Sequence, residues 1–299
     1  MEKRLNPSMT KKILKVTGLV IGVLVVIIAG YYTKAHISTN QRMHKKYAVT
    51  PQVLPILNDS AVLARGEHLT RIKSCNGCHG KDLGGKVFVD NPALGLLIAP
   101  NLTKGKGGRP ADYNAEDWSL ALRHGLRRDR TPLLFMPSHE FTLMSEEDMT
   151  AIISYCANLQ PIDREFPETN LGPLARVLAD LDKLPLFPAE MIDHDRKMVK
   201  EVKAEISTEY GKYLSTSCTG CHRENLKGGD PVAPGFPEVA DISGSGHPGQ
   251  WTDEQFIQTL RTGVTPEGKT LNPEEMPWTM TKEFSDLELK ALHLYLKSI

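Results

Sequence analysis

Two short stretches of the chain combine two cysteines and a histidine at the same spacing. Residues 75–79 read Cys-Asn-Gly-Cys-His, and residues 218–222 read Cys-Thr-Gly-Cys-His. Thiols two residues apart lie about one helical turn from each other, so both can form thioethers with one haem while the adjoining histidine binds its iron. Each stretch therefore predicts one covalently bound haem c. The residues assigned to the two haems are Cys75, Cys78, His79, Cys218, Cys221 and His222.

Paired cysteines also occur in redox dithiols and in zinc sites. A thioredoxin-like dithiol is expected in a βαβ context, which the sequence does not show. A four-cysteine zinc site usually separates its two pairs by about 15 to 20 residues, whereas the second motif here begins 143 positions after the first. Neither alternative explains why a histidine follows each second cysteine, so haem attachment is the better interpretation.

The two motifs are the centres of an internal repeat with a period of about 140 residues. In each half, a glycine sits in a short helix before the motif, where it allows another helix to cross closely. A second helix follows that ends at a glycine, and a serine then opens the last helix. The matched landmarks are Gly66 and Gly211, the helices over 115–124 and 253–262, and Ser145 and Ser285. The repeat predicts a mostly α-helical chain with two similar domains.

A methionine followed by proline occurs at a matched position in both halves. Met136 and Met276 lie 57 and 54 residues after their histidines and nine residues before the serines that open the last helices. A thioether opposite the histidine favours reduced iron, so we predict these methionines as the second axial ligands. Two nearby methionines fall in the final-helix pattern, and two other neighbours have no counterpart in the other half. These alternatives are Met144, Met149, His139 and Met280.

Several further residues receive weaker assignments. The carbonyl of Pro100 is expected to accept a hydrogen bond from the ring of His79, because ligating histidines are usually held in this way. No equivalent acceptor can be named for His222. Cys156 falls on the apolar side of the last helix of its half, which indicates a buried side chain rather than a reactive thiol. The remaining histidines near the motifs are interpreted as surface or packing residues: His68, His124 and His293.

The N-terminal region predicts a membrane anchor. Residues 13–32 are long and apolar enough to cross a bilayer as a helix, with Lys15 extending to the interface. No small-residue cleavage site of the A-x-A kind follows, so an uncleaved anchor is favoured over a cleaved signal. Residues 1–12 then form a cytoplasmic N-terminus and residues 33–58 a tether. Basic residues flank both ends almost equally, so charge alone does not set the orientation.

Charge is distributed unevenly along the chain. Residues 1–50 carry a net charge of +8, so residues 51–299 carry −8 within a total of zero. A mildly acidic outer portion disfavours nucleic acid as a partner. Because haem c is attached on the outer face of the energy-transducing membrane, we expect the haem domains on the periplasmic side of a cell inner membrane.

The order of these landmarks resembles class I cytochrome c, twice over. The resemblance covers about residues 60–160 and 206–299, and it implies domains at 59–162 and 206–299 joined by a connection at 163–205. The segments Pro-Asn-Leu-Thr at 100–103 and Arg-His-Gly at 123–125 are also similar to the membrane-anchored cytochrome c subunits of bacterial alcohol, aldehyde and gluconate dehydrogenases. Those subunits often carry three haems, whereas this sequence contains two motifs.

The sequence thus predicts a membrane-anchored dihaem cytochrome c that transfers single electrons, with no catalytic residue and no enzymatic activity of its own. Its donor is expected to be a dehydrogenase or a quinol-oxidising complex of a respiratory chain, and its acceptor a terminal oxidase or a soluble cytochrome. The alternative is a dihaem enzyme such as a peroxidase or a thiosulfate-oxidising cytochrome, which requires an accessible iron. The connection is expected to contain a helix over 174–181 and to pack between the domains.

Overall fold

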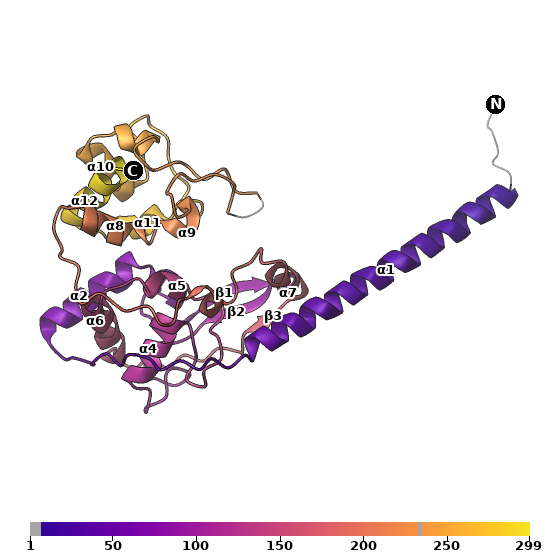
Figure 1. The fold of residues 1–299 in the computed structure, drawn as a ribbon, viewed down its shortest axis with the longest axis horizontal. Coiled ribbons are helices and arrows are strands. Elements are labelled where there is room, and N and C mark those ends of the chain that lie inside the picture. Colours follow the sequence, from indigo (N-terminus) through magenta and orange to yellow (C-terminus); the bar gives the residue numbers. More distant parts are fainter. Residues whose placement is uncertain (1–6, 233–234) are drawn as a thin grey trace.

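Two mostly helical domains follow a long N-terminal helix in the computed structural model, which describes residues 7–232 and 235–299 (Figure 1). The first domain contains α2 (Ser60–Ile72), α3 (Cys75–His79), β1 (Lys86–Asn91), β2 (Gly95–Ala99), α4 (Ala115–His124), α5 (Ser138–Phe141) and α6 (Glu146–Ala157). The connection contains β3 (Asn170–Leu171), α7 (Pro173–Asp180) and the short 3-10 helix η1 (Pro188–Met191). The second domain contains α8 (Thr208–Ser215), α9 (Thr219–His222), η2 (His247–Gln250), α10 (Asp253–Thr262), α11 (Trp278–Thr281) and α12 (Asp286–Lys297). The predicted mostly α-helical fold in two tandem domains is confirmed.

The N-terminal helix α1 spans Pro7–Met43 and projects away from the domains (Figure 1). Its apolar part has a mean hydropathy of 2.6, so the helix is long and apolar enough to cross a membrane. The helix continues beyond the predicted anchor, because residues 33–43 of the predicted tether are also helical. Residues 1–6 of the predicted cytoplasmic segment lie outside the described residues.

The end of α1 is fixed to the first domain through α7. The Asp180 carboxylate accepts hydrogen bonds from the Tyr31 hydroxyl at 2.9 Å and from the Lys34 ammonium at 2.6 Å. About two turns further along α1, the Arg42 guanidinium donates to the carbonyl of Ala179 at 2.7 Å and lies over the ring of Phe187. Helix α1 and the first domain are therefore joined by packed side chains and not only by the chain that links them.

The two glycines of the repeat allow the helix crossings on which both domains are built. A Cβ atom at Gly66 of α2 would lie 2.1 Å from the carbonyl oxygen of Ala151 on α6. A Cβ atom at Gly211 of α8 would lie 2.0 Å from the carbonyl oxygen of Ala291 on α12. Any side chain at either position would force the helices apart, so the predicted role of these glycines is confirmed.

The connection packs against the rest of the chain, but its helix and strand lie on the first domain and on α1 and not between the two domains. Strand β3 adds an antiparallel edge to β2, which also pairs with β1, to give a small sheet that the sequence analysis did not predict. Arg164 forms an ion pair with Asp82 at 2.8 Å. The predicted helix over 174–181 is observed one residue earlier as α7. The expectation that the connection packs between the domains was therefore wrong for these elements, because sheet pairing and the α1 contact hold them on the first domain.

The domains meet at two buried carboxylates, and each carboxylate is contacted by a side chain from the other domain. Asp148 and Glu288 occupy the same position, N3, of the equivalent helices α6 and α12. The Tyr213 hydroxyl of the second domain donates to Asp148 at 2.8 Å, while the His68 ring of the first domain lies 2.9 Å from Glu288. Arg65 contacts both carboxylates. Each domain thus supplies a partner for the carboxylate of the other.

An apolar core continues across this interface. A single cluster of buried side chains includes Leu69 and Ile153 of the first domain together with Tyr210 and Leu292 of the second. Tyr210 is fully buried, and its hydroxyl donates to Glu288 at 3.2 Å. Because apolar contacts adjoin these polar contacts, the domains are held in one arrangement by both.

We predict that Glu288→Gln weakens the domain interface. Burial alone would raise the pKa of the Glu288 carboxyl, but hydrogen bonds from His68 and from the backbone N–H of Ser285 lower it to about 2. The ionised side chain therefore stabilises the fold above its unfolded pKa of 4.5, and this contribution disappears as the pH falls from there towards 2. At neutral pH, denaturant unfolding should show a loss of about 2 to 4 kcal/mol in the variant.

The control for this prediction is Glu283→Gln, which alters a more exposed carboxylate whose distance to Arg71 is 3.9 Å. This substitution should lower the free energy of unfolding by less than about 0.5 kcal/mol. The variant Glu288→Gln should also lose stability less steeply than the natural protein between pH 5 and pH 3. Equal unfolding free energies for the two variants would contradict the assignment of Glu288 to the interface.

Candidate haem-binding sites

The four motif cysteines lie on two short helices as free thiols. Cys75 and Cys78 are on α3, and Cys218 and Cys221 are at the start and within α9. Burial raises the pKa of the Cys75 and Cys218 thiols to about 12. Redox dithiols and zinc-binding thiolates need the opposite shift. Within the described residues, no three His, Cys, Asp or Glu side chains come together as a metal-binding group. The two pairs lie on separate helices, each with its histidine directly after the second cysteine, which is the arrangement that haem attachment requires.

Both motif histidines are held by backbone carbonyls in the same way. The Nδ1–H of His79 donates to the carbonyl of Pro100 at 2.8 Å, as predicted, and the Nδ1–H of His222 donates to the carbonyl of Ala240 at 2.8 Å. This hydrogen bond places the proton on Nδ1 and leaves the Nε2 lone pair available for iron. Burial lowers the pKa of His79 to about 4 and lowers that of His222 as well. In both domains burial thus disfavours the protonated ring, which could not bind a metal.

The sequence analysis missed the acceptor at Ala240. A carbonyl acceptor does not depend on the type of side chain, so the absence of a second proline was not informative. The signal lay one residue later: the side chains of Asn101 and Asp241 accept hydrogen bonds from the backbone N–H groups of Thr103 and Ser243 at 2.9 and 2.8 Å. These matched turns aim the preceding carbonyl at the histidine in each domain.

The two predicted methionine ligands occupy matched loops. The carbonyl of Met136 accepts from the N–H of Ser138, and that of Met276 from the N–H of Trp278, both at 2.7 Å. Both side chains are partly buried against the core cluster, which Cys75 and Cys218 also contact. Among the alternatives, Met144 and Met149 are buried in the core, and Met280 is on α11. Ligation of iron by Met136 and Met276 remains a prediction.

His139 is the alternative ligand closest to Met136. It lies on α5, and its Nδ1 atom is buried without a hydrogen-bond partner among the described residues. The other histidines act in packing. His124 and His293 are fully buried, and His68 lies at the domain interface. Cys156 is buried in the core, which confirms the prediction for that residue.

A partly buried arginine fits a further requirement of haem, whose propionates are acidic. The Nε atom of Arg109 is buried and has no hydrogen-bond partner among the described residues. Its guanidinium lies over the rings of Tyr113 and Trp118, at 5.1 and 5.8 Å from their centroids. A buried donor without an acceptor suits a carboxylate that arrives with the haem. The sequence analysis missed Arg109, although it stands at the position matched by His247 in the second half.

The two motifs approach each other across the domain interface. Lys73, two residues before the first motif, donates to the hydroxyls of Ser217 at 2.9 Å and Thr216 at 3.2 Å, directly before the second motif. The carboxylate of Glu140 lies 2.9 Å from the position that a Cβ atom on Gly220 would take. Burial lowers the pKa of Lys73 and raises that of Glu140. The haem-attachment sites therefore share one partly buried, charged boundary.

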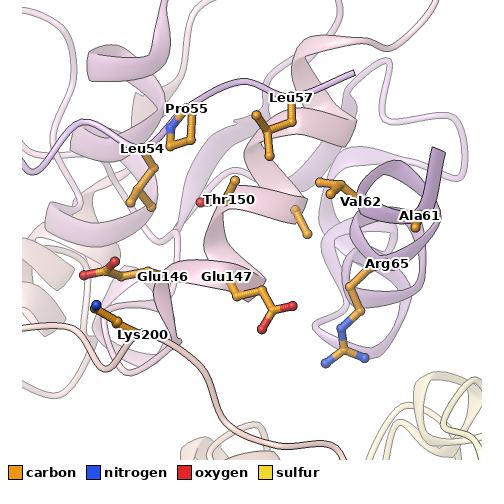
Figure 2. A pocket seen from close by; sticks show the side chains of 11 residues that line it. Leu54, Pro55, Leu57, Ala61, Val62, Arg65, Glu146, Glu147, Thr150 and Lys200 are labelled. Atoms are coloured by element: carbon orange, nitrogen blue, oxygen red, sulfur yellow. The ribbon is translucent and has the colours of Figure 1, made fainter. Parts of the chain in front are cut away.

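A groove in the first domain is separate from both motifs. Figure 2 shows it between the segment before α2, the helices α2 and α6, and Lys200 of the connection, with charged side chains at its edge and apolar side chains inside. Its lining consists of Leu54, Pro55, Leu57, Ala61, Val62, Arg65, Glu146, Glu147, Thr150, Ala151 and Lys200. No motif cysteine, histidine or predicted methionine lines it, so its carboxylates do not provide an acid or base at either haem site.

Comparison with known proteins assigns both motif-bearing regions to one family. The family model for cytochrome c matches residues 63–160 and 208–299. The chain is 26% identical over 259 residues to the fructose dehydrogenase cytochrome subunit of Gluconobacter japonicus, which covers 79% of this chain and 52% of that protein. It is 24% identical over 270 residues to the cytochrome c subunit of the quinone-dependent alcohol dehydrogenase of Gluconobacter oxydans, covering 81% and 55%.

A third relative matches a shorter region. The gluconate 2-dehydrogenase cytochrome c subunit of Pantoea cypripedii is 31% identical over 102 residues, or 32% of this chain and 23% of that protein. The chain spans about half the length of the first two relatives. The resemblance stated from the sequence motifs is therefore confirmed.

We predict that Met136→Ala and Met276→Ala each remove the methionine signature of one haem. The oxidised natural protein should show methionine-to-iron absorption in the near infrared, and each variant should lose about half of it and have one haem of lower reduction potential. Met144→Leu and Met280→Leu are the controls, because they replace methionines outside the matched loops. A purely bis-histidine spectrum of the natural protein, or loss of the signal in a control, would rule out the assignment.

Proposed function

Because the chain belongs to the cytochrome c family, we propose that it is a membrane-anchored dihaem cytochrome c that transfers single electrons between redox proteins. When bound, each haem iron supplies a one-electron oxidation and reduction. The observation that carries the proposal is the matched pair of attachment helices that meet at one domain interface, with Lys73 of the first domain bonded to Ser217 beside the second motif.

In this proposal the polypeptide holds the two haems and controls their surroundings. The motif cysteines would attach them covalently, and the carbonyls of Pro100 and Ala240 hold His79 and His222 in one orientation with the proton on Nδ1. Met136 and Met276 would supply the second protein ligand of each iron and keep small molecules from binding there. Closed coordination suits electron transfer, which needs little structural change between oxidation states.

We further propose that the donor is a dehydrogenase and that the domains lie on the periplasmic side of the inner membrane. Three relatives are cytochrome subunits of fructose, alcohol and gluconate dehydrogenases, which supports a dehydrogenase as partner. The apolar length of α1 supports an anchor, and its packing on α7 supports a fixed position of the first domain near the bilayer. The acceptor would be a terminal oxidase or a soluble cytochrome.

The experiment that tests the relay is a spectroelectrochemical titration of the detergent-solubilised protein. The natural protein should carry two covalent haems by intact mass and take up two electrons per chain. The variant Cys218→Ala/Cys221→Ala should carry one haem and take up one electron, whereas Cys156→Ala, which removes a buried thiol outside the motifs, should keep both.

Enzyme assays address the alternative of a dihaem peroxidase or a thiosulfate-oxidising cytochrome. The purified protein should show no substantial steady-state turnover of peroxide or thiosulfate. Sustained turnover with either compound would replace the relay by an enzymatic function. If the protein carries two haems but exchanges no electrons with a co-purified dehydrogenase, that donor is excluded and the electron-transfer function still stands.

A further inference from the structure

The surface formed by the methionine loop and the hairpin before it is covered in the first domain and exposed in the second. In each domain a hairpin follows the glycine that ends α4 or α10, and the predicted methionine loop comes next. We call residues 125–136 the first methionine face and residues 263–276 the second. The hairpins have the same hydrogen bonds: Leu133 N–H donates to Gly125 and Leu271 N–H donates to Gly263, both at 2.7 Å. The faces are therefore structurally equivalent.

The first methionine face is covered by other parts of the chain. The segment after α1 bonds to its hairpin, since Tyr47 N–H donates to the carbonyl of Arg130 at 3.2 Å and Lys46 contacts Asp129 at 2.8 Å. The connection bonds to its loop, since Phe135 N–H donates to the carbonyl of Leu186 at 3.0 Å. Leu126 is fully buried under these segments. In the first domain, this face therefore binds other segments of the same chain.

The second methionine face is exposed. Val264, at the position of Leu126, is 40% exposed. Between the hairpin and Met276 the loop is two residues longer than in the first domain, and the added length carries Glu274 and Glu275, both exposed. Trp278 lies against Gly263 and donates to the carbonyl of Leu271 at 3.1 Å, so the loop is held from inside. The face is therefore a formed surface with no cover from the described residues.

The charges on the second methionine face indicate which kind of partner would bind there. Glu267 at the hairpin tip joins Glu274 and Glu275 on the exposed side, against one exposed cation, Lys269. Residues 206–299 as a whole contain thirteen acidic and eight basic residues. A negative surface with an apolar centre attracts a positively charged partner and guides its approach.

We propose that the second methionine face is the docking surface for an electron-transfer protein whose redox group is surrounded by Lys and Arg side chains. The proposal rests on the proposed function, because it assigns one end of the relay to a surface. The carbonyl and side-chain contacts that cover the first methionine face make the second domain the one that meets this partner.

Charge reversal tests the proposal. The double variant Glu274→Lys/Glu275→Lys should react about tenfold more slowly with a lysine-rich soluble monohaem cytochrome c at low ionic strength, and added salt should reduce the difference. Its reaction with ferricyanide, an anion, should become faster. The control is Asp90→Lys/Glu201→Lys, which changes two exposed carboxylates outside the second domain by the same total charge.

A second measurement does not depend on electron transfer. Carbodiimide cross-linking to the same lysine-rich cytochrome should yield peptides that contain Glu267, Glu274 or Glu275, as identified by mass spectrometry. Equal rates for the double variant and the control, or cross-links confined to the first domain, would overturn the proposal. Failure of the relay itself is distinguishable, because the natural protein would then also fail to exchange electrons with ferricyanide.

Discussion

The reciprocal contact of two buried carboxylates with the opposite domain fixes the arrangement on which a relay depends. Asp148 and Glu288 begin as local features, since each lies in the first turn of a final helix where a negative charge is favourable. Each then accepts a hydrogen bond from the other domain, from Tyr213 or from His68. Each carboxylate also has partners in its own domain, Arg65 for Asp148 and Tyr210 and Ser285 for Glu288. Loss of the partner from the other domain would leave a buried charge only partly paired, which is costly in a protein. The hydrogen bonding of both carboxylates is therefore completed only when the domains are together.

This constraint explains why the two attachment motifs face one boundary. Helices α2 and α8 lead directly into the motifs, and both contribute side chains to these contacts. Fixing these helices also fixes Lys73 against Ser217 and Glu140 beside Gly220. Electron transfer between two haems depends on a short and constant separation, and an interface with a continuous apolar core provides this without a hinge. The electrostatics of the boundary follow from the same packing, because it partly buries Lys73 and Glu140.

The features predicted from the sequence were those set by local rules. Motif spacing, glycine positions, helix caps and the serine that opens each final helix act within a few residues, and the repeat made each of them visible twice. The sheet was not predicted, because β3 is only two residues long and pairs with a strand more than seventy positions earlier. Ala240 and Arg109 were missed for other reasons. A backbone acceptor has no residue signature, and one arginine in a loop shows its unpaired Nε only after folding.

The roles of Asp148 and Glu288 show why such interfaces escape sequence analysis. Both residues fit a helix N-terminus, so nothing in the pattern required a second role, and partner choice across domains depends on contacts more than sixty residues apart. The same limit applies to the methionine faces. Leu126 and Val264 are similar residues at equivalent positions, yet one is buried and the other exposed. The difference comes from segments outside the repeat, which cover the first methionine face and leave the second uncovered by the described residues. The repeat thus gives two equivalent sites, and the segments outside it give them different surroundings.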